Sequence, residues 1–92
     1  MSIMVTVTFT PNLQRHVSSP PREVNATTVS EALHQIFAVN EMLAGYILDD
    51  QHRLRKNIAI FVDGAMIQDR HTLTDPLQPT SDVQVLQALS GG

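Results

Sequence analysis

The sequence contains no cysteine, which excludes disulfide bridges, thiolate metal sites and cysteine nucleophiles. The same absence fits a reducing compartment, and we expect a cytoplasmic protein. No apolar run approaches the roughly 20 residues that a membrane-spanning helix needs. The first residues also lack a basic segment followed by an apolar run. We therefore expect no membrane partner and no secretory signal peptide.

Basic residues are scarce as well. The 92 residues include six Lys and Arg against nine Asp and Glu, a formal net charge of −3, and only Arg53, Arg55 and Lys56 cluster. Proteins that hold a phosphate backbone usually carry a larger basic patch, so we expect no nucleic-acid partner. No two of the histidines have the i, i+4 spacing of a helical metal site, and we expect no metal.

What remains is the composition of an ordinary small globular domain. Hydrophobic residues make up 42% and charged residues 16% of the chain, which is long enough for a modest core without metal or disulfide staples. There are no repeats and no low-complexity tracts. We expect one domain over residues 1–88 and a flexible tail over residues 89–92.

Three segments alternate apolar and polar residues as half-buried strands do. The first covers 3–9, with Ile3, Val5, Val7 and Phe9 on one face. Residues 22–26 predict a short second strand that pairs back on the first as a hairpin. Residues 82–88 predict the last strand, with Val83 and Val85 facing inward.

One segment has helical spacing. Thr28 and Glu31 have the spacing of a capping box, and Thr27 is the competing N-cap. The apolar residues that follow recur on one face of a helix: Val29, Ala32, Leu33, Ile36 and Phe37. Asn40 is suited to end this helix. The spacing then breaks around Gly45, and we expect one loose turn and a loop over 41–51.

The second half of the chain predicts a hairpin. Residues 57–62 predict a strand, and Asp63-Gly64 is the strongest short hairpin signal present. Residues 66–68 return as a short edge strand, and the loop over 73–79 is anchored by Leu77. The order β-β-α-β-β-β predicts an α+β fold, in which one main helix packs on a mixed sheet of four to five strands. Parallel neighbouring first and last strands would complete the β-grasp arrangement of ubiquitin.

Two of the four glycines are Gly91 and Gly92, the last residues of the sequence. A residue without Cβ accepts φ on both sides of zero, so such a tail can thread a narrow channel and present a carboxylate to a reactive centre. A frayed end is the alternative interpretation.

Residues 82–92, which read D-V-Q-V-L-Q-A-L-S-G-G, resemble the end of the ubiquitin-like sulfur carriers of the MoaD/ThiS family. The hairpin segment over 58–64 and the helix start over 28–33 resemble the corresponding motifs of that family. The resemblance spans nearly the whole chain. Gln87 departs from it, because many members have Pro there. The segment from Asn40 to Lys56 is longer than in the compact thiamin-type carriers, which favours the CysO type or the molybdopterin synthase small subunit.

The resemblance implies a covalent carrier that is not itself an enzyme and binds no cofactor. An E1-like adenylyltransferase of the MoeB/ThiF type would use ATP and Mg²⁺ to adenylate the Gly92 carboxylate. A sulfur donor would displace AMP and leave a thiocarboxylate, which a downstream synthase would accept. Leu89, Ser90 and Gly91 would form the rest of the tail, and a tail-processing metalloprotease is a further implied partner.

A docking patch is expected on the face of the sheet that points away from the helix. Phe61 and Leu86 alternate with inward-facing neighbours, and Met4 has the same parity on the first strand. If these strands are adjacent, the three residues would form an exposed apolar patch near the tail. Arg53 and Arg55 would flank this patch, or would pair with Asp49 and Asp50 in a solvated loop.

Three functions stay open at this point. The activated Gly92 could carry sulfur toward cysteine, molybdopterin, a thiazole or another metabolite, and the long middle segment favours cysteine or a metabolite. It could instead be joined to lysine amines as a protein modifier. The domain could also be a binding module without tail chemistry, in which case deletion of Gly92 would leave its function intact.

Overall fold

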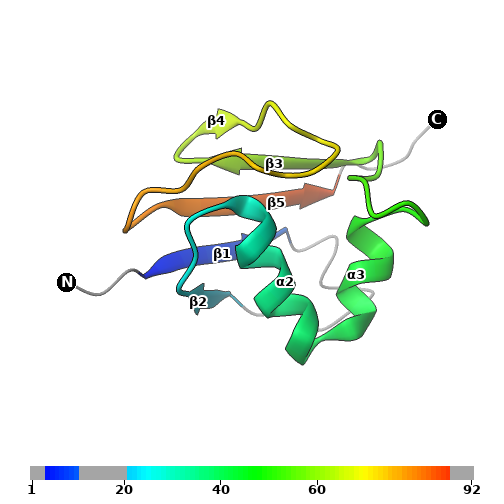
Figure 1. The fold of residues 1–92 in the computed structure, drawn as a ribbon, viewed down its shortest axis with the longest axis horizontal. Coiled ribbons are helices and arrows are strands. Elements are labelled where there is room, and N and C mark those ends of the chain that lie inside the picture. The colour runs from blue at the N-terminus through cyan, green and yellow to red at the C-terminus, as the bar shows by residue number, and fades with distance from the viewer. Residues whose placement is uncertain (1–3, 11–20, 88–92) are drawn as a thin grey trace.

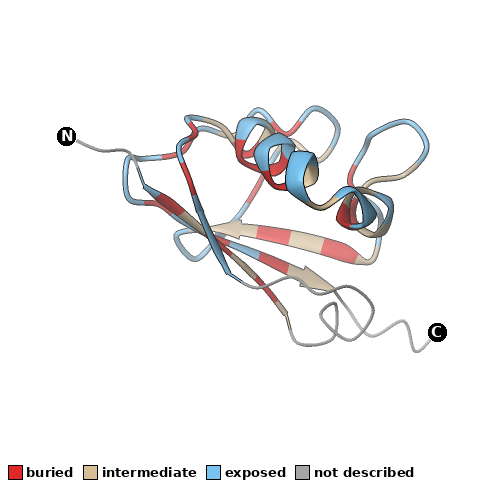
Figure 2. Ribbon diagram, turned by 90° about the horizontal axis from the view of Figure 1, so that it is seen from below, coloured by how far each residue is buried: buried red, intermediate tan, exposed pale blue. Residues whose placement is uncertain are grey.

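The computed structural model describes residues 4–10 and 21–87. In chain order the elements are β1 (Val5–Phe9), β2 (Arg22–Val24), α2 (Val29–Val39), α3 (Glu41–Ile47), β3 (Ile58–Val62), β4 (Ala65–Met66) and β5 (Asp82–Gln87). The strands form one five-stranded sheet, and helices α2 and α3 lie on the same side of it (Figures 1 and 2). The tail residues 89–92 lie outside the described residues. Within the described part of the chain, no helix is long and apolar enough to cross a membrane.

The sheet has the strand order β2-β1-β5-β3-β4. Strands β1 and β5 are parallel, with Val7 opposite Val83, and the other pairs are antiparallel. The predicted hairpin of the first two strands and the predicted parallel pairing of the first and last strands are therefore confirmed. This is the β-grasp arrangement, in which the chain crosses from β2 to β3 through the helical layer (Figure 1).

Helix α2 begins at the predicted cap. The Thr28 hydroxyl accepts a hydrogen bond from the Glu31 N–H at 3.2 Å, so Thr28 and not Thr27 is the N-cap. The other half of the capping box is altered, because the Glu31 carboxylate accepts from the Thr27 N–H at 2.9 Å. The helix ends at Asn40, whose N–H donates to the Ile36 carbonyl at 2.9 Å.

Helix α3 corrects the sequence prediction of a loose turn over 41–51. Its residues Leu43 and Ile47 are buried one turn apart, while Met42 is exposed. The Gly45 carbonyl accepts a hydrogen bond from Arg55 Nε at 2.9 Å. Packing of two apolar side chains therefore holds a helical turn across a glycine that disfavours it locally.

The predicted hairpin forms at Asp63 and Gly64, whose φ angles are 51° and 88°. Two consecutive positive φ values are typical of a type I′ turn. This turn pairs Val62 with Ala65 and Phe61 with Met66. The return strand β4 is Ala65–Met66, one residue earlier and shorter than predicted, and it lies at the sheet edge.

The loop that follows β4 clamps the start of α2. The Val29 N–H donates to the Asp75 carbonyl, the Ser30 N–H to the Leu73 carbonyl, and the Leu77 N–H to the Thr27 carbonyl, at 2.8 to 3.1 Å. Leu73 and the predicted anchor Leu77 are buried.

The core lies between the sheet and the helices. The sheet contributes Val5, Val7, Phe9, Ile58, Ile60, Val83 and Val85, and α2 contributes Val29, Ala32, Leu33 and Ile36. All are nearly fully buried. Figure 2 shows buried segments on the strands and on the helices above them. The alternation read from the sequence thus corresponds to the two faces of the sheet, and α2 and α3 pack on only one of them.

Candidate functional site

The sheet face opposite α2 and α3 is built from residues that alternate with the core. The strand registers place Thr8 beside Gln84, Gln84 beside Phe61, and Phe61 beside Met66. A second row places Leu86 beside Ala59. Because the side-chain period of a strand is two, these residues share the outer face.

Four of them form an apolar group that we call the outer patch: Ala59, Phe61, Met66 and Leu86. Met66 is 55% exposed, and the other three are half-buried. Leu86 also borders a shallow cavity of about 220 Å³ with Thr8, Thr10 and Gln84. The predicted neighbours Phe61 and Leu86 are thus brought together on adjacent strands.

Met66 and Ala59 were missed by the sequence prediction of the patch. A two-residue Asp63-Gly64 turn fixes Phe61 opposite Met66, so the hairpin signal was sufficient to add Met66. Ala59 could also have been assigned to the outer patch, because it lies two residues before Phe61 on the same strand and shares its face.

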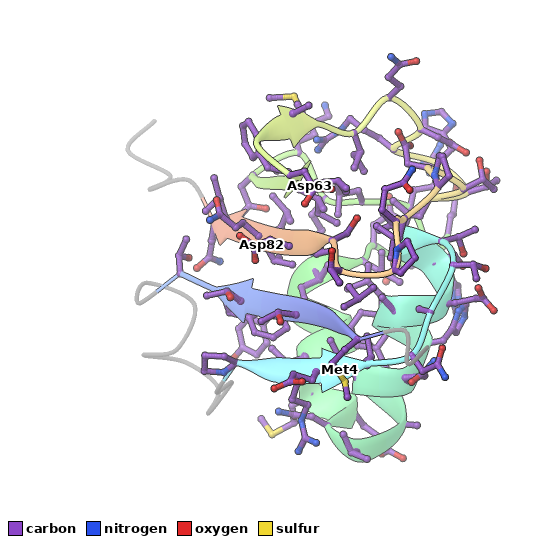
Figure 3. All side chains as sticks on the ribbon, turned by 90° about the vertical axis from the view of Figure 1, so that its left-hand side faces the viewer. Met4, Asp63 and Asp82 are labelled. Carbon is purple, nitrogen blue, oxygen red and sulfur yellow. The ribbon has the colours of Figure 1, made fainter. Side chains whose placement is uncertain are left out.

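Met4 does not join the outer patch. It is exposed, and its N–H donates to the Pro79 carbonyl at 2.8 Å, just before β1 begins. Because Phe9 is the partner of Val85, Leu86 lies at the opposite end of the β1–β5 pair from Met4. Figure 3 shows Met4 near the end of the sheet where Asp63 and Asp82 lie. The prediction that Met4 lies in one patch near the tail is therefore wrong.

Arg53 and Arg55 lie in the loop between α3 and β3. Arg53 Nε is 3.5 Å from the Asp49 carboxylate, and Arg55 Nε donates to the Gly45 carbonyl in α3. The Arg53 N–H donates to Asp49 at 2.9 Å, and this bond is the main cause of the lowered pKa of Asp49. The predicted pairing of Arg53 with Asp49 is confirmed. Neither arginine is part of the outer patch, because Arg53 is held by Asp49 and Arg55 by α3.

The described residues contain no group of three or more His, Asp or Glu that could hold a metal ion. His34 Nδ1 lies 2.9 Å from the Ser30 carbonyl on α2.

Strand β5 carries the outer patch to the root of the tail. Its last residue, Gln87, pairs with Ile58, and its N–H donates to the Thr10 hydroxyl at 3.3 Å. A proline at position 87 could not make this bond, since it has no N–H. The Gln87 Oε1 is buried and accepts no hydrogen bond from the described residues. In this chain, therefore, the strand is held by the sheet up to residue 87.

The family of the chain follows from its sequence. Residues 14–92 match the ThiS family. The chain belongs to the ThiS family. No curated protein matches it significantly in sequence.

Solved structures support the fold of this ThiS family protein. The crystal structure of SAMP1 from Haloferax volcanii is 17% identical in sequence and has a TM-score of 0.81. The similarity covers 97% of this chain and 99% of the SAMP1 chain. The Amycolatopsis orientalis BexX/CysO complex contains a chain that is 19% identical with a TM-score of 0.80, over 96% of this chain and 99% of that chain. A chain in the complex of subunits 1 and 2 of molybdopterin-converting factor from Helicobacter pylori is 21% identical with a TM-score of 0.63, over 97% and 99%. Two of these similar structures are complexes with a partner protein.

Proposed function

We propose that this protein is a sulfur carrier whose reactive group is the carboxylate of Gly92. An E1-like enzyme of the MoeB/ThiF type, with Mg²⁺ in the enzyme, transfers AMP from ATP to this carboxylate and releases pyrophosphate. A sulfur nucleophile then attacks the acyl carbon, AMP leaves, and a thiocarboxylate remains. A synthase accepts the sulfur from this end. The protein is a cosubstrate in these steps and not the catalyst.

Activation is required by the chemistry of the carboxylate. A carboxylate resists nucleophiles because its leaving group would be oxide, whereas an acyl adenylate releases AMP. The enzyme supplies the charged groups that stabilise the transferred phosphate, and the carrier supplies recognition and a narrow tail.

The observation that carries the proposal is the continuity of β5. In a ThiS family chain, one strand presents Leu86 in the outer patch and leads directly toward Gly91 and Gly92. A partner that docks on the outer patch therefore has the root of the tail beside it. Neighbouring structures determined as complexes are consistent with such a docking role.

The proposal is tested by the intact mass of the protein isolated from its own cells, with fragmentation of the C-terminal end. We expect one oxygen of Gly92 to be replaced by sulfur. The chain has four methionines, and oxidation of any of them adds nearly the same mass. The fragments must therefore place the change on Gly92, and deletion of Gly92 must abolish it. An unmodified Gly92 after incubation with ATP, sulfide and the activating enzyme would refute the proposal.

A second candidate is a protein modifier, which the likeness to small archaeal modifier protein 1 favours. The same acyl adenylate would then react with a lysine amine and form an isopeptide. Lys56 is the only lysine in the sequence, so a conjugate between two copies through a lysine would map there. Adducts on other proteins without a thiocarboxylate would favour this function over the carrier.

A further inference from the structure

A basic cavity lies beside the start of β3, between the α3–β3 loop and the loop that follows β4. Its volume is about 250 Å³, and it is lined by Asp49, Arg53, Leu54, Lys56, Arg70 and His71. Three of the six Lys and Arg residues of the chain line this single cavity, although the net charge of the chain is −3. Positive charge is thus concentrated at one place on an otherwise acidic protein.

The cations of this cavity have capacity for a further anion. Lys56 is exposed, and no ion pair involves it within residues 4–10 and 21–87. The Arg53 side chain is 45% exposed and meets Asp49 at 3.5 Å. One terminal nitrogen of Arg70 donates hydrogen bonds to the Arg55 and Ile58 carbonyls, both at 2.8 Å. A guanidinium has five N–H donors, so Arg70 is fixed in place and keeps donors to offer.

Among the described residues, Asp49 is the one carboxylate that lines the cavity, and its oxygens already accept hydrogen bonds or face a cation. Its Oδ1 accepts from the N–H groups of Gln51 and Arg53 at 2.9 Å, and its Oδ2 faces Arg53. Three cations against one carboxylate leave the cavity with a formal charge of +2, with His71 left out of the count.

Ile58 connects this cavity to the root of the tail. It pairs with Gln87 across β3 and β5, and its carbonyl accepts from Arg70. Its N–H donates to the Arg55 carbonyl at 3.0 Å, which closes a tight turn that presents Lys56. Figure 1 shows the end of β5 and the start of β3 at the same end of the sheet. Five residues extended at about 3.4 Å each reach roughly 17 Å, whereas neighbouring strands are only about 4.8 Å apart.

We infer that this basic cavity binds the protein's own C-terminal carboxylate whenever no partner holds the tail. A tether of five residues gives an effective concentration of the order of millimolar, so contacts too weak to hold a free anion become populated. A thiocarboxylate is also an anion and fits the same cations. The reactive end is then held on the carrier surface, and a partner must compete for it. The inference concerns the free carrier and does not depend on adenylation.

The test compares the 92-residue chain with the same chain made as a C-terminal carboxamide, by NMR at neutral pH and low salt. We expect the Nε–H resonances of Arg53 and Arg70 and the amide of Lys56 to differ between the two forms. The Arg22 resonance, on exposed β2, should not differ. The differences should shrink near 1 M salt, where the screening length is about 3 Å. Identical Arg53 and Arg70 resonances in the two forms would overturn the inference.

A double variant, Arg53→Gln with Lys56→Gln, removes two exposed cations and leaves the structural Arg70 in place. We expect the Gly92 amide resonance to move in this variant and to stay unchanged in the matched control Arg22→Gln. An unmoved Gly92 amide resonance in the double variant would place the tail elsewhere and refute the inference. Separate mass analysis of thiocarboxylate formation distinguishes this failure from a failure of the proposed function.

Discussion

Asp63 and Asp82 exchange two hydrogen bonds at the place where β5 begins beside the β3–β4 turn. The Asp82 N–H donates to Asp63 Oδ1, and the Asp63 N–H donates to the Asp82 carbonyl, both at 2.9 Å. Figure 3 shows the two residues side by side. The hydroxyl of buried Ser81 donates to Asp63 Oδ2 at 2.8 Å. A turn residue therefore fixes the start of the strand that leads to the tail.

The variant Asp63→Ala should lower the free energy of unfolding more than Asp63→Asn does. Alanine leaves the buried Ser81 hydroxyl and the Asp82 N–H without their acceptor. It also disfavours the φ of 51°, which asparagine tolerates. Asparagine keeps one oxygen as an acceptor. Urea unfolding of both variants measures the difference, and equal losses would contradict this account.

The two described glycines should respond to alanine in opposite directions. Gly64 has a φ of 88°, so Gly64→Ala should lower the free energy of unfolding by about 1–2 kcal/mol. Gly45 is helical, and Gly45→Ala should raise it by about 0.5–1 kcal/mol. Neither added Cβ meets an atom within 4 Å, so the difference isolates the backbone. Thermal or urea unfolding measures both free energies, and a change of the same sign in the two variants would refute this prediction.

Much of the sheet was predictable because its signals are local. Alternating Val5, Val7 and Phe9 identify a half-buried strand without knowledge of its partners. The Asp63-Gly64 turn fixes its own strand register, since two residues with positive φ leave little choice. The helix cap at Thr28 follows from a hydroxyl three residues before Glu31.

Features that depend on distant contacts were not predictable in the same way. Helix α3 is stabilised by the burial of Leu43 and Ile47, which outweighs the low helix propensity of Gly45. The error at Met4 has a different cause. Met4 has the parity of the outer face, but it lies at the start of the first strand, whereas Leu86 lies near the end of the last. The predicted parallel pairing of these strands, which the structure confirms, already separates the two residues.

Acid should destabilise the protein through carboxylates that accept hydrogen bonds in the folded state. Donation by the Thr72 hydroxyl, then by the Thr74 hydroxyl, lowers the pKa of Asp69 far below its ordinary value. The Asp82 N–H, then the Ser81 hydroxyl, lowers the pKa of Asp63. The folded pKa of each carboxyl lies below its unfolded value of about 3.9. The stabilisation is therefore complete above the unfolded pKa and is lost as the pH falls toward the folded pKa.

The variant Asp69→Asn tests this assignment. We expect the free energy of unfolding to fall in the wild type between about pH 5 and pH 2, and to fall less steeply in the variant. At pH 7 the variant should be the less stable protein, because it loses the charged acceptor. Denaturation across this pH range measures both curves, with Glu23→Gln on exposed β2 as the control. Parallel curves for wild type and Asp69→Asn would show that Asp69 does not contribute to the acid transition.

Docking of the activating enzyme should depend on the outer patch and not on the helical face. Met66 and Met42 are 55% and 63% exposed, on opposite sides of the molecule, and form a matched pair. Placing a charge in a desolvated contact commonly costs more than 1 kcal/mol, so Met66→Glu should slow thiocarboxylate formation on Gly92 about tenfold at subsaturating carrier. Met42→Glu and Met4→Glu should leave the rate close to that of the wild type. Equal loss in Met66→Glu and Met42→Glu, with both variants folded, would mean that the enzyme does not select the sheet face.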